Sequence, residues 1–271
     1  MEETSKDKLQ KLRQSLRKME KVLVAFSGGV DSTFLLKVAH EELGHNVLAV
    51  TATSSTYPAQ EQRDAQKIVE ELGVRHKFIV SEELEIEGFA DNPPNRCYYC
   101  KKERYTKLWE LAKAEGINYL LDGSNFDDLA DHRPGMLAAK ELEVRSPLME
   151  VGLTKEEIRF LSKELNLPTW KKPSFACLSS RFPYGTRITK EKLAQVDRGE
   201  EVLRALGFQQ FRLRHHGEIA RIELTRDQFS LMMEKVDLVV DELKKCGFTY
   251  VTMDLQGYRT GSMNETLNIR G

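Results

Sequence analysis

The strongest constraint on the fold is an apolar run that ends in a serine- and glycine-rich loop and then passes at once into a helical pattern. Residues 21–33 read Lys-Val-Leu-Val-Ala-Phe-Ser-Gly-Gly-Val-Asp-Ser-Thr. The first half predicts a buried parallel strand, and the apolar spacing that follows predicts a helix. Glycines let the backbone curl around an anion, and the amides at the start of the helix point at it. The loop therefore predicts an anion site, and the lack of a following Gly-Lys-Ser/Thr excludes a Walker A loop.

The polar side chains of this loop suit a phosphate ligand. Ser27 and Ser32 can add hydroxyl donors to the backbone amides that Gly28 and Gly29 leave accessible. Asp31 offers a carboxylate for Mg²⁺ or for a substrate hydroxyl.

The composition indicates a globular protein without a strong electrostatic field of either sign. The 271 residues are 40% hydrophobic and 31% charged, with a formal net charge of −1. Stable binding along a nucleic acid is therefore not expected, and no run reaches the roughly 18 apolar residues of a membrane span. The charged N-terminal pattern is unlike a signal peptide. We expect a cytoplasmic protein of about two domains.

Strand-like and helical patterns alternate through the first two-thirds of the chain. Expected strands lie at 22–26, 47–52, 76–80 and 119–121, with a weaker one at 144–146. Expected helices lie at 32–43, 59–72, 99–114 and 133–142. Such alternation predicts an α/β fold with a parallel sheet and helices on both faces. Ligands of such sheets bind beyond the carboxyl ends of the strands.

The regular pattern stops at a proline-rich segment and then changes. Helices are expected at 190–206 and 226–245, and strands at 209–214, 219–224 and 249–254. This order predicts a small α+β domain of ferredoxin-like type. We expect the α/β domain at 1–170, a cysteine-bearing active-site loop or linker at 171–188, the small domain at 189–255 and a loosely ordered tail at 256–271.

Three of the four cysteines form a metal-binding pattern. Cys97 and Cys100 are a C-x-x-C pair at the start of an expected helix, where the helix dipole and the following lysines favour the metal-binding thiolate. Cys177 lies in the distant linker. Three thiolates suit a [4Fe–4S] cluster with one open iron, which can hold a sulfide or a substrate. Zinc with a fourth ligand such as Cys246 or His132, and thiol–disulfide chemistry without a metal, stay open.

A cluster of acids follows the fourth expected strand, where a nucleotide would lie. The run from Gly123 continues through Asp127, Asp128 and Asp131. Asp127 and Asp131 share a helix face, and carboxylates at this edge suit a magnesium ion that bridges phosphates. We expect Asp31 and Asp127 to bind Mg²⁺, with Asp128 near the nucleotide as a further candidate ligand. The plainer interpretation is an acid-rich helix start.

Basic side chains alternate along the first expected strand of the small domain. Arg212, Arg214 and His216 share one strand face, and two guanidiniums suit a phosphate. Arg181, in the linker, is a second candidate clamp for a phosphate or a carboxylate. A solvated strand face is the plainer interpretation of the first group, and a solvated helix face is the expectation for Glu200.

Together these motifs resemble the LarE family of ATP-dependent sulfur transferases. The loop at 27–32 is similar to the Ser-Gly-Gly-Xaa-Asp-Ser pyrophosphate loop of N-type ATP pyrophosphatases, and segments 123–128, 131–135, 176–181 and 212–216 add the family's other motifs. The resemblance covers residues 12 to 255. It implies that ATP is split into AMP and pyrophosphate while a carboxylate of pyridinium-3,5-biscarboxylic acid mononucleotide is adenylated and then receives sulfur. The product is a precursor of the nickel-pincer cofactor of lactate racemase.

The resemblance also implies roles for individual residues. ATP would be bound by Ser27, Gly28, Gly29, Asp31, Ser32, Gly123 and Asp128. The phosphate and carboxylates of the substrate would be held by Ser180, Arg181, Arg212 and Arg214. Cys177 takes the sulfur-delivery position. The additional Cys97 and Cys100 place the chain in the three-cysteine [4Fe–4S] branch, rather than in the branch that sacrifices a cysteine sulfur. A homo-oligomer, such as a hexamer, is also implied, and the sulfide source is left open.

Three other functions stay open on the sequence alone. A tRNA thiolation enzyme can also combine a pyrophosphate loop with a three-cysteine cluster, but the near-neutral charge and the lack of a recognisable RNA-binding module disfavour it. An ammonia-dependent amide synthetase would need no cysteine triad. A nucleotide- or metal-sensing module would bind ATP without releasing pyrophosphate.

Overall fold

Four apolar runs in the first half of the chain become one parallel sheet in the computed structural model, which describes residues 2–130, 134–173, 176–259 and 261–267. The strands are β1 (Val22–Ala25), β2 (Val47–Thr53), β3 (Arg75–Val80) and β4 (Tyr119–Leu121), in the order β3-β2-β1-β4. Every pairing between them is parallel. The predicted α/β architecture is therefore confirmed.

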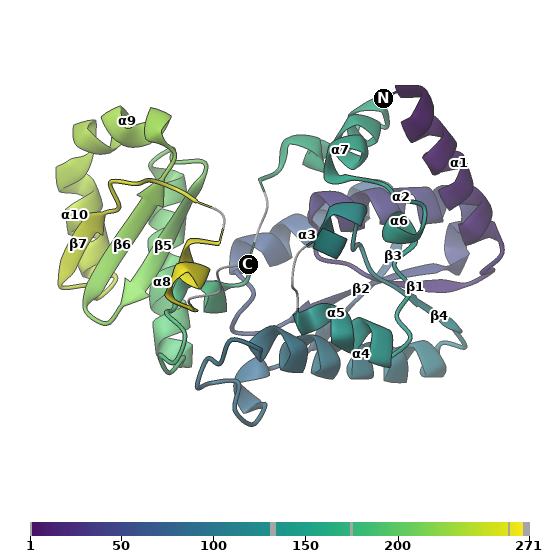
Figure 1. The fold of residues 1–271 in the computed structure, drawn as a ribbon, viewed down its shortest axis with the longest axis horizontal. Coiled ribbons are helices and arrows are strands. Elements are labelled where there is room, and N and C mark those ends of the chain that lie inside the picture. Colours follow the sequence, from purple (N-terminus) through teal and green to yellow (C-terminus); the bar gives the residue numbers. More distant parts are fainter. Residues whose placement is uncertain (1, 131–133, 174–175, 260, 268–271) are drawn as a thin grey trace. The chain divides into compact units, whose positions relative to one another are not determined.

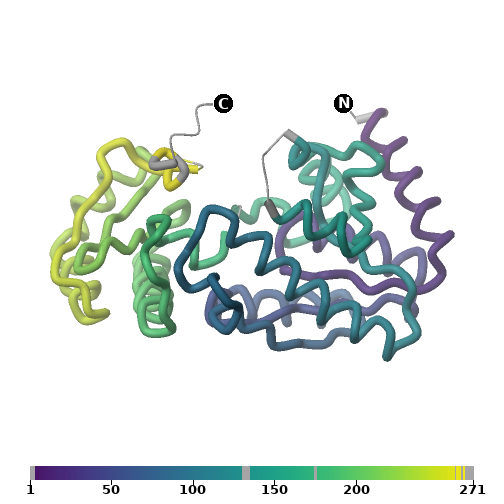
Figure 2. Tube along the Cα trace, turned by 60° about the horizontal axis from the view of Figure 1, so that its bottom comes forward, coloured from purple at the N-terminus to yellow at the C-terminus, as the bar shows by residue number. Residues whose placement is uncertain are grey.

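Helices cover both faces of this sheet (Figure 1). They are α1 (Glu2–Arg17), α2 (Val30–Leu43), α3 (Ala59–Leu72), α4 (Arg96–Ala114), α5 (Pro134–Glu141), α6 (Pro147–Glu150) and α7 (Lys155–Glu164). Val22 and Val24 pack into a core with α1, α2 and α7, whereas Leu23 points to the opposite core with α4. Burial of both faces explains why β1 and the first four residues of β2 are apolar. Helices α4 and α5 lie side by side (Figures 1 and 2).

The second part of the chain folds around a small mixed sheet. Its elements are α8 (Lys190–Ala205), β5 (Phe211–His216), β6 (Ile219–Leu224), α9 (Phe229–Glu234), α10 (Val236–Lys245) and β7 (Tyr250–Met253). Strand β6 is central and pairs antiparallel with β5 and parallel with β7. Leu203, Leu213 and Leu243 meet in one core that α8 and α10 close against the sheet. The expected small α+β domain is therefore present.

A short segment from the first half of the chain belongs to this second unit. The described residues of Met1–Glu83 and Asn95–Phe175 form the first unit, and those of Leu84–Pro94 and Ala176–Gly271 form the second. The segment is fixed by Asn92, whose fully buried side-chain amide donates to Phe182 O (3.2 Å) and Pro183 O (2.8 Å). No pattern in the sequence indicated this exchange.

Three local expectations differ from the structure. The weak strand at 144–146 is only a single bridge between Leu121 and Arg145. The helix expected over 226–245 is divided, and Lys235 lies at the break, where its ammonium donates to Leu206 O (2.6 Å). The tail is not loose over its described length, because Ser262 is buried within a 3-10 turn.

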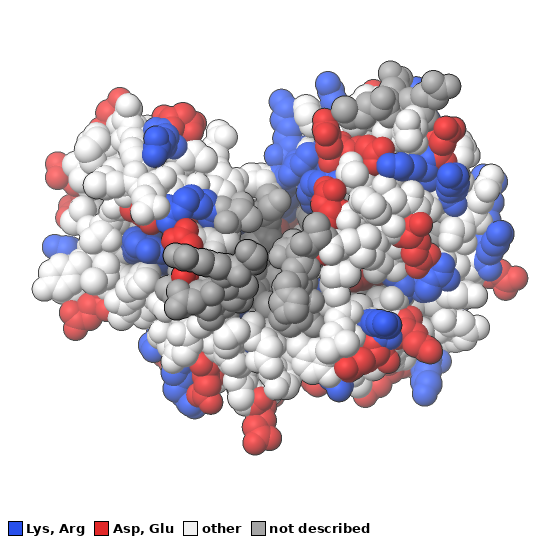
Figure 3. All heavy atoms as spheres, viewed as in Figure 1, with Lys and Arg blue, Asp and Glu red and all other residues white. Residues whose placement is uncertain are grey.

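The surface of each unit carries charges of both signs. On the face drawn in Figure 3, acidic and basic side chains are interspersed. Across the described residues, no helix has both the length and the apolar composition that a membrane crossing requires.

Candidate active site

The loop after β1 is closed by its own serines, and it leaves the first amides of α2 for a ligand. The hydroxyl oxygens of Ser27 and Ser32 lie 3.0 Å apart, and Ser32 Oγ donates to Gly29 O (3.3 Å). Gly29 is the N-cap of α2 and provides no side-chain cap. The first amides of an uncapped helix need another acceptor. The start of α2 can therefore bind a phosphate.

Two glycines allow this loop to pack closely against its neighbours. Gly28 has a φ of 65°, and a Cβ there would lie 3.2 Å from Ala65 Cα. Gly123 follows β4, and a Cβ there would lie 2.9 Å from Ser32 N and 3.1 Å from Ser32 Cα. Because these neighbours are backbone atoms, a side chain at Gly123 would displace the start of α2.

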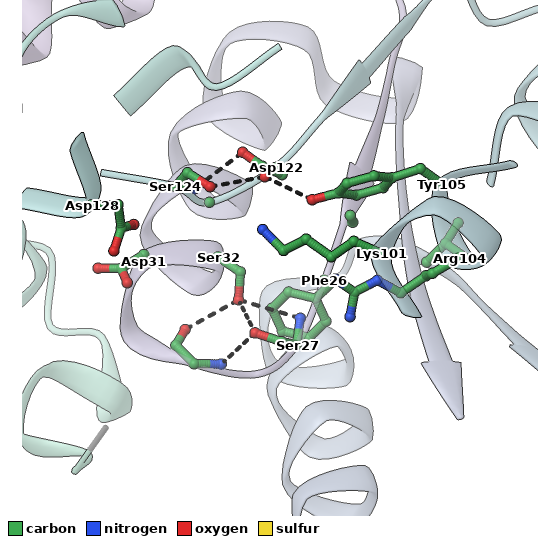
Figure 4. A pocket seen from close by; sticks show the side chains of 14 residues that line it. Phe26, Ser27, Asp31, Ser32, Lys101, Arg104, Tyr105, Asp122, Ser124 and Asp128 are labelled. Atoms are coloured by element: carbon green, nitrogen blue, oxygen red, sulfur yellow. Dashed lines mark hydrogen bonds between the residues drawn. The ribbon is translucent and has the colours of Figure 1, made fainter. Parts of the chain in front are cut away.

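A pocket opens beyond the carboxyl ends of β1 and β4 (Figure 4). It is lined by Ala25, Phe26, Ser27, Gly29, Asp31, Ser32, Val50, Lys101, Arg104, Tyr105, Asp122, Gly123, Ser124 and Asp128. The carboxylates of Asp31 and Asp128 lie on one side of the pocket, and Lys101 and Arg104 extend from α4 on the other. The pocket therefore has an acidic and a basic side.

The acidic side is centred on Asp31. Its Oδ2 accepts a hydrogen bond from Lys155 Nζ (2.6 Å), whereas its buried Oδ1 has no hydrogen-bond partner among the described residues. Burial raises the pKa of Asp31, the Lys155 ammonium opposes this shift, and the nearby Asp128 carboxylate adds to it. Two close carboxylates with an unsatisfied oxygen suit a divalent cation with oxygen ligands.

Asp127 and Asp128 have different positions. Asp128 lines the pocket, and its Oδ2 accepts a bond from Asn125 N (3.0 Å). Asp127 does not line the pocket, and its Oδ2 accepts a bond from Lys155 N (2.8 Å), at the start of α7. The structure thus places Asp128, rather than Asp127, beside Asp31. Asp131 lies outside the described residues.

The back of the pocket is a hydrogen-bonded group around Asp122. Tyr105 Oη and Ser124 Oγ donate to Asp122 Oδ2 (2.8 and 2.9 Å), and Ser146 Oγ donates to Oδ1 (2.6 Å). Burial, reinforced by the Asp122 carboxylate, raises the pKa of Tyr105. Tyr105 therefore remains a protonated donor, and this group fixes the chain after β4 against α4.

Two of the predicted thiols lie in the first turn of α4. Cys97 is exposed and Cys100 is half-buried, and Cys100 Sγ donates to Glu83 Oε1 (3.5 Å). The other oxygen of Glu83 accepts a bond from Thr56 Oγ1 (3.1 Å). Cys177 belongs to the second unit. In the part of the chain that the structure describes, no three metal-binding side chains gather, so the three-cysteine cluster stays a prediction.

Cys246, considered above as a zinc ligand, is buried in the core of the second unit. Burial raises the pKa of its thiol. Both observations favour a packing role. His132, the other candidate fourth ligand, lies outside the described residues.

Arg181 is fixed in the interior of the second unit and holds the backbone that carries Cys177. Its side chain is 1% exposed. Nε and Nη2 donate to the two carboxylate oxygens of Glu200 (2.8 and 3.0 Å), and Nη1 donates to Ala176 O (2.7 Å) and Cys177 O (3.1 Å). Burial acts to raise the pKa of Glu200, but the Arg181 guanidinium lowers it overall. The expectation of a solvated helix face for Glu200 is therefore wrong.

Arg214 is also buried and paired. Its Nη2 lies 2.8 Å from Glu223 Oε2, and its Nη1 donates to Ser180 O (2.8 Å). Ser262 Oγ accepts a bond from Arg214 Nη2 and donates one to Glu223 Oε1, each at 2.9 Å. At 5% exposure, Arg214 does not lie on a solvated strand face.

Arg212 lies in a more positive environment than Arg214. Its guanidinium is 5.2 Å from the centre of the Tyr258 ring. Burial and the neighbouring Arg181 guanidinium lower the pKa of Arg212 to about 10. Nearby positive charge that disfavours the cationic form marks a place where an added anion is stabilising.

Proteins of related sequence point to one family. A family model described as a PP-loop domain matches residues 1–133. An uncharacterized protein of Synechocystis sp. is 46% identical over 96% of this chain and 98% of its own length. The pyridinium-3,5-bisthiocarboxylic acid mononucleotide synthase of Lactiplantibacillus plantarum is 41% identical over 93% of this chain and 92% of its own length. The chain belongs to the LarE family. A tRNA-specific 2-thiouridylase of Rickettsia africae is 29% identical over 58% of this chain and 53% of its own length.

As a LarE-family protein, the chain is an ATP-dependent PP-loop sulfur transferase. The structure brings together in one pocket most of the residues expected to bind ATP, namely Ser27, Gly29, Asp31, Ser32, Gly123 and Asp128. The residues expected to bind the rest of the substrate lie in the second unit, namely Cys177, Ser180, Arg181, Arg212 and Arg214.

Several pocket residues of this LarE-family protein were not predicted as such, among them Arg104, Tyr105, Asp122 and Ser124. One signal was available for α4, since Lys101 and Arg104 are three residues apart and share a helix face. Room for Lys101 is left by Gly135 on α5, where a Cβ would lie 2.6 Å from Lys101 Cδ.

Proposed function

We propose that this LarE-family enzyme uses ATP to activate a carboxylate of pyridinium-3,5-biscarboxylic acid mononucleotide and then replaces a carboxylate oxygen with sulfur. The relative from L. plantarum is named as the synthase of the corresponding bisthiocarboxylic acid mononucleotide. The observation that carries the proposal is the pocket of the first unit. It combines a phosphate-binding loop, an acidic side and the helix that bears Cys97 and Cys100.

ATP would lie with its phosphates on the loop at 27–32 and with Mg²⁺ on the acidic side. Asp31 and Asp128 would hold the ion, because their carboxylates are adjacent and Asp31 Oδ1 is unsatisfied within the described residues. Asp127 instead binds the start of α7, so the expected ligand pair changes from Asp31 and Asp127 to Asp31 and Asp128. The ion would bridge the phosphates and neutralise their charge.

Adenylation turns a poor electrophile into a reactive one. A carboxylate oxygen of the substrate attacks the α-phosphorus of ATP, the bond from that phosphorus to the bridging oxygen breaks, and pyrophosphate leaves with the electron pair. No proton is transferred in this step. The protein contributes position and electrostatic stabilisation, through the amides of α2 and the cations of α4.

Sulfur would come from a [4Fe–4S] cluster held by Cys97, Cys100 and Cys177. When bound, such a cluster offers an open iron that can carry an additional sulfide. The protein supplies thiols and position: Cys97 and Cys100 share one helical turn, and Arg181 fixes the carbonyl of Cys177. Arg212 and Arg214, near Ser180, would hold the phosphate of the mononucleotide, because the positive environment of Arg212 favours an anion.

The test is turnover by anaerobically purified protein supplied with the mononucleotide, Mg²⁺, ATP and sulfide. We expect AMP, pyrophosphate and a thiocarboxylate product by mass spectrometry over many turnovers, and about four irons per chain. Cys97→Ala/Cys100→Ala should lose the iron and the product, whereas the control Cys246→Ala should keep both. An iron-free protein whose Cys177 loses one sulfur in a single turnover would contradict the cluster. ATP turnover that needs tRNA and leaves the mononucleotide unchanged would contradict the substrate.

A homo-oligomer also belongs to this proposal, by resemblance to the family. Light scattering of the purified protein tests it, and a monomer at micromolar concentration would contradict it.

A further inference from the structure

Arg104 is a charged side chain of the pocket that the ATP-binding residues described above do not include. It lines the pocket from α4, and its guanidinium lies 5.5 Å from the centre of the Tyr105 ring. Its Nε is buried without a hydrogen-bond partner, and no carboxylate pairs with it within 4 Å, among the described residues. An arginine carries five donors and cannot lose its charge. The structure therefore leaves Arg104 with binding capacity for an anionic ligand.

The acidic neighbour of Arg104, Glu83, directs its hydrogen bonds elsewhere, whereas the Tyr105 hydroxyl is also within hydrogen-bonding reach of Arg104. Both oxygens of Glu83 accept bonds, from Cys100 and from Thr56, and the hydroxyl of Tyr105 donates to Asp122. Burial acts to lower the pKa of Arg104, but Cys100, Tyr105 and Glu83 raise it overall. These three groups favour the charged form of the guanidinium, but among the described residues none of them forms an ion pair with it.

Arg104 lines the pocket and lies on the same helix, α4, as the thiols of Cys97 and Cys100. Figure 4 shows Arg104 across the pocket from Asp31 and Asp128. Cys100 precedes it by four residues on α4, so the two side chains are neighbours on one helix face. An anion held by Arg104 would therefore lie away from the magnesium side and within one helical turn of Cys100.

We propose that Arg104 binds the carboxylate that ATP activates. This inference rests on the function proposed above. In that function the loop amides and Mg²⁺ on the acidic side bind the ATP phosphates. The anion on the basic side is therefore the substrate carboxylate that accepts the adenylyl group. A guanidinium matches both oxygens of a carboxylate, and it orients one of them toward the α-phosphorus. The acyl group is then formed beside the turn that carries Cys97 and Cys100.

The test measures binding rather than turnover. Arg104→Gln removes both the charge and the planar set of guanidinium donors, whereas Arg104→Lys keeps only the charge. Lys113 is exposed near the far end of α4, and Lys113→Gln is the matched control. Two probes are titrated calorimetrically: α,β-methylene-ATP with Mg²⁺, and then pyridine-3,5-dicarboxylate on protein saturated with that analogue. Thermal unfolding midpoints report whether each variant is folded.

We expect Arg104→Gln to bind the ATP analogue within about threefold of wild type and the dicarboxylate about 10- to 100-fold more weakly. Arg104→Lys should lie between, and Lys113→Gln should match wild type. Equal dicarboxylate binding by wild type and Arg104→Gln, or none by wild type, would overturn the inference. Loss of analogue affinity with unchanged dicarboxylate binding would also overturn it, because the guanidinium would then bind ATP phosphate.

The inference and the proposed function can fail separately. The binding assay stays decisive even if sulfur insertion is never observed. Conversely, thiocarboxylate formation by Arg104→Gln with an unchanged KM for the mononucleotide would overturn the role of Arg104 and leave the proposed function intact.

Discussion

At the scale of single residues, Gly123 is the position where one added carbon should disable nucleotide binding. In Gly123→Ala the new Cβ would lie 2.9 Å from Ser32 N, so either the chain after β4 or the first turn of α2 must move. We expect a stability loss of about 1–3 kcal/mol and at least a ~10-fold weaker affinity for the ATP analogue, since phosphate binding depends on those amides. Calorimetry and thermal unfolding measure both.

Gly116→Ala is the control for Gly123→Ala. Gly116 has a φ of 63° and open space around it, so the substitution strains only its own backbone. We expect a stability loss of about 1 kcal/mol with unchanged analogue affinity. Wild-type affinity in Gly123→Ala would refute the role of its close contact.

We expect the buried carboxylate of Asp31 to lower the stability of the protein at neutral pH. Its folded pKa lies above the unfolded value, with burial as the main cause. Its favourable contribution is therefore present below the unfolded pKa and is lost as pH rises through the folded pKa. Asp31→Asn should have an equal or higher unfolding midpoint at pH 7, and this advantage should disappear near pH 3. Pyrophosphate release should fall by at least ~100-fold.

Asp127→Ala separates the two candidate magnesium ligands. It removes the acceptor for Lys155 N, and we expect it to cost about 1 kcal/mol of stability, as the loss of a helix cap does. Its apparent affinity for Mg²⁺ in the ATP assay should remain near wild type. A loss of Mg²⁺ affinity as large as that of Asp31→Asn would restore Asp127 as a ligand.

At the scale of elements, the pair of Arg181 and Glu200 joins the loop of Cys177 to α8. Glu200→Gln leaves a guanidinium at 1% exposure without its counter-charge, and we expect a loss of about 3–5 kcal/mol at pH 7. The folded pKa of Glu200 is depressed, so its contribution is present above the unfolded pKa and is lost as pH falls through the folded one. Urea unfolding at pH 7 and pH 4 measures both.

A double substitution distinguishes stability from position in the same pair. Arg181→Met/Glu200→Leu replaces the ion pair by apolar side chains, and we expect it to regain most of the lost stability. Sulfur transfer should not return, because the bonds from Arg181 to Ala176 O and Cys177 O are gone. Recovery of product formation would show that these bonds do not position Cys177.

At the scale of the whole molecule, local patterns determine most of what could be predicted. The hexapeptide at 27–32 carries its own turn, donors and helix start. Strand β1 and the first four residues of β2 are apolar because both of their faces are buried. Arg104 and Asp122 were not predicted as pocket residues, because only the packing of α4 against the sheet and the pairing of β1 with β4 bring them beside the loop at 27–32. Glu200 was misjudged because its partner, Arg181, lies 19 residues away in a loop.

Because every described residue that lines the pocket belongs to the first unit, nucleotide binding should protect the two units unequally from hydrogen exchange. With α,β-methylene-ATP and Mg²⁺ at about 100 times Kd, amides that exchange by opening of the pocket should slow by roughly 100-fold. We expect this slowing in residues 27–32 and at the starts of α2 and α4, whereas β5 and β6, which contribute nothing to the lining, should be unchanged. Mass-spectrometric exchange over hours measures both. Equal slowing over residues 211–224 would show that the nucleotide acts on both units.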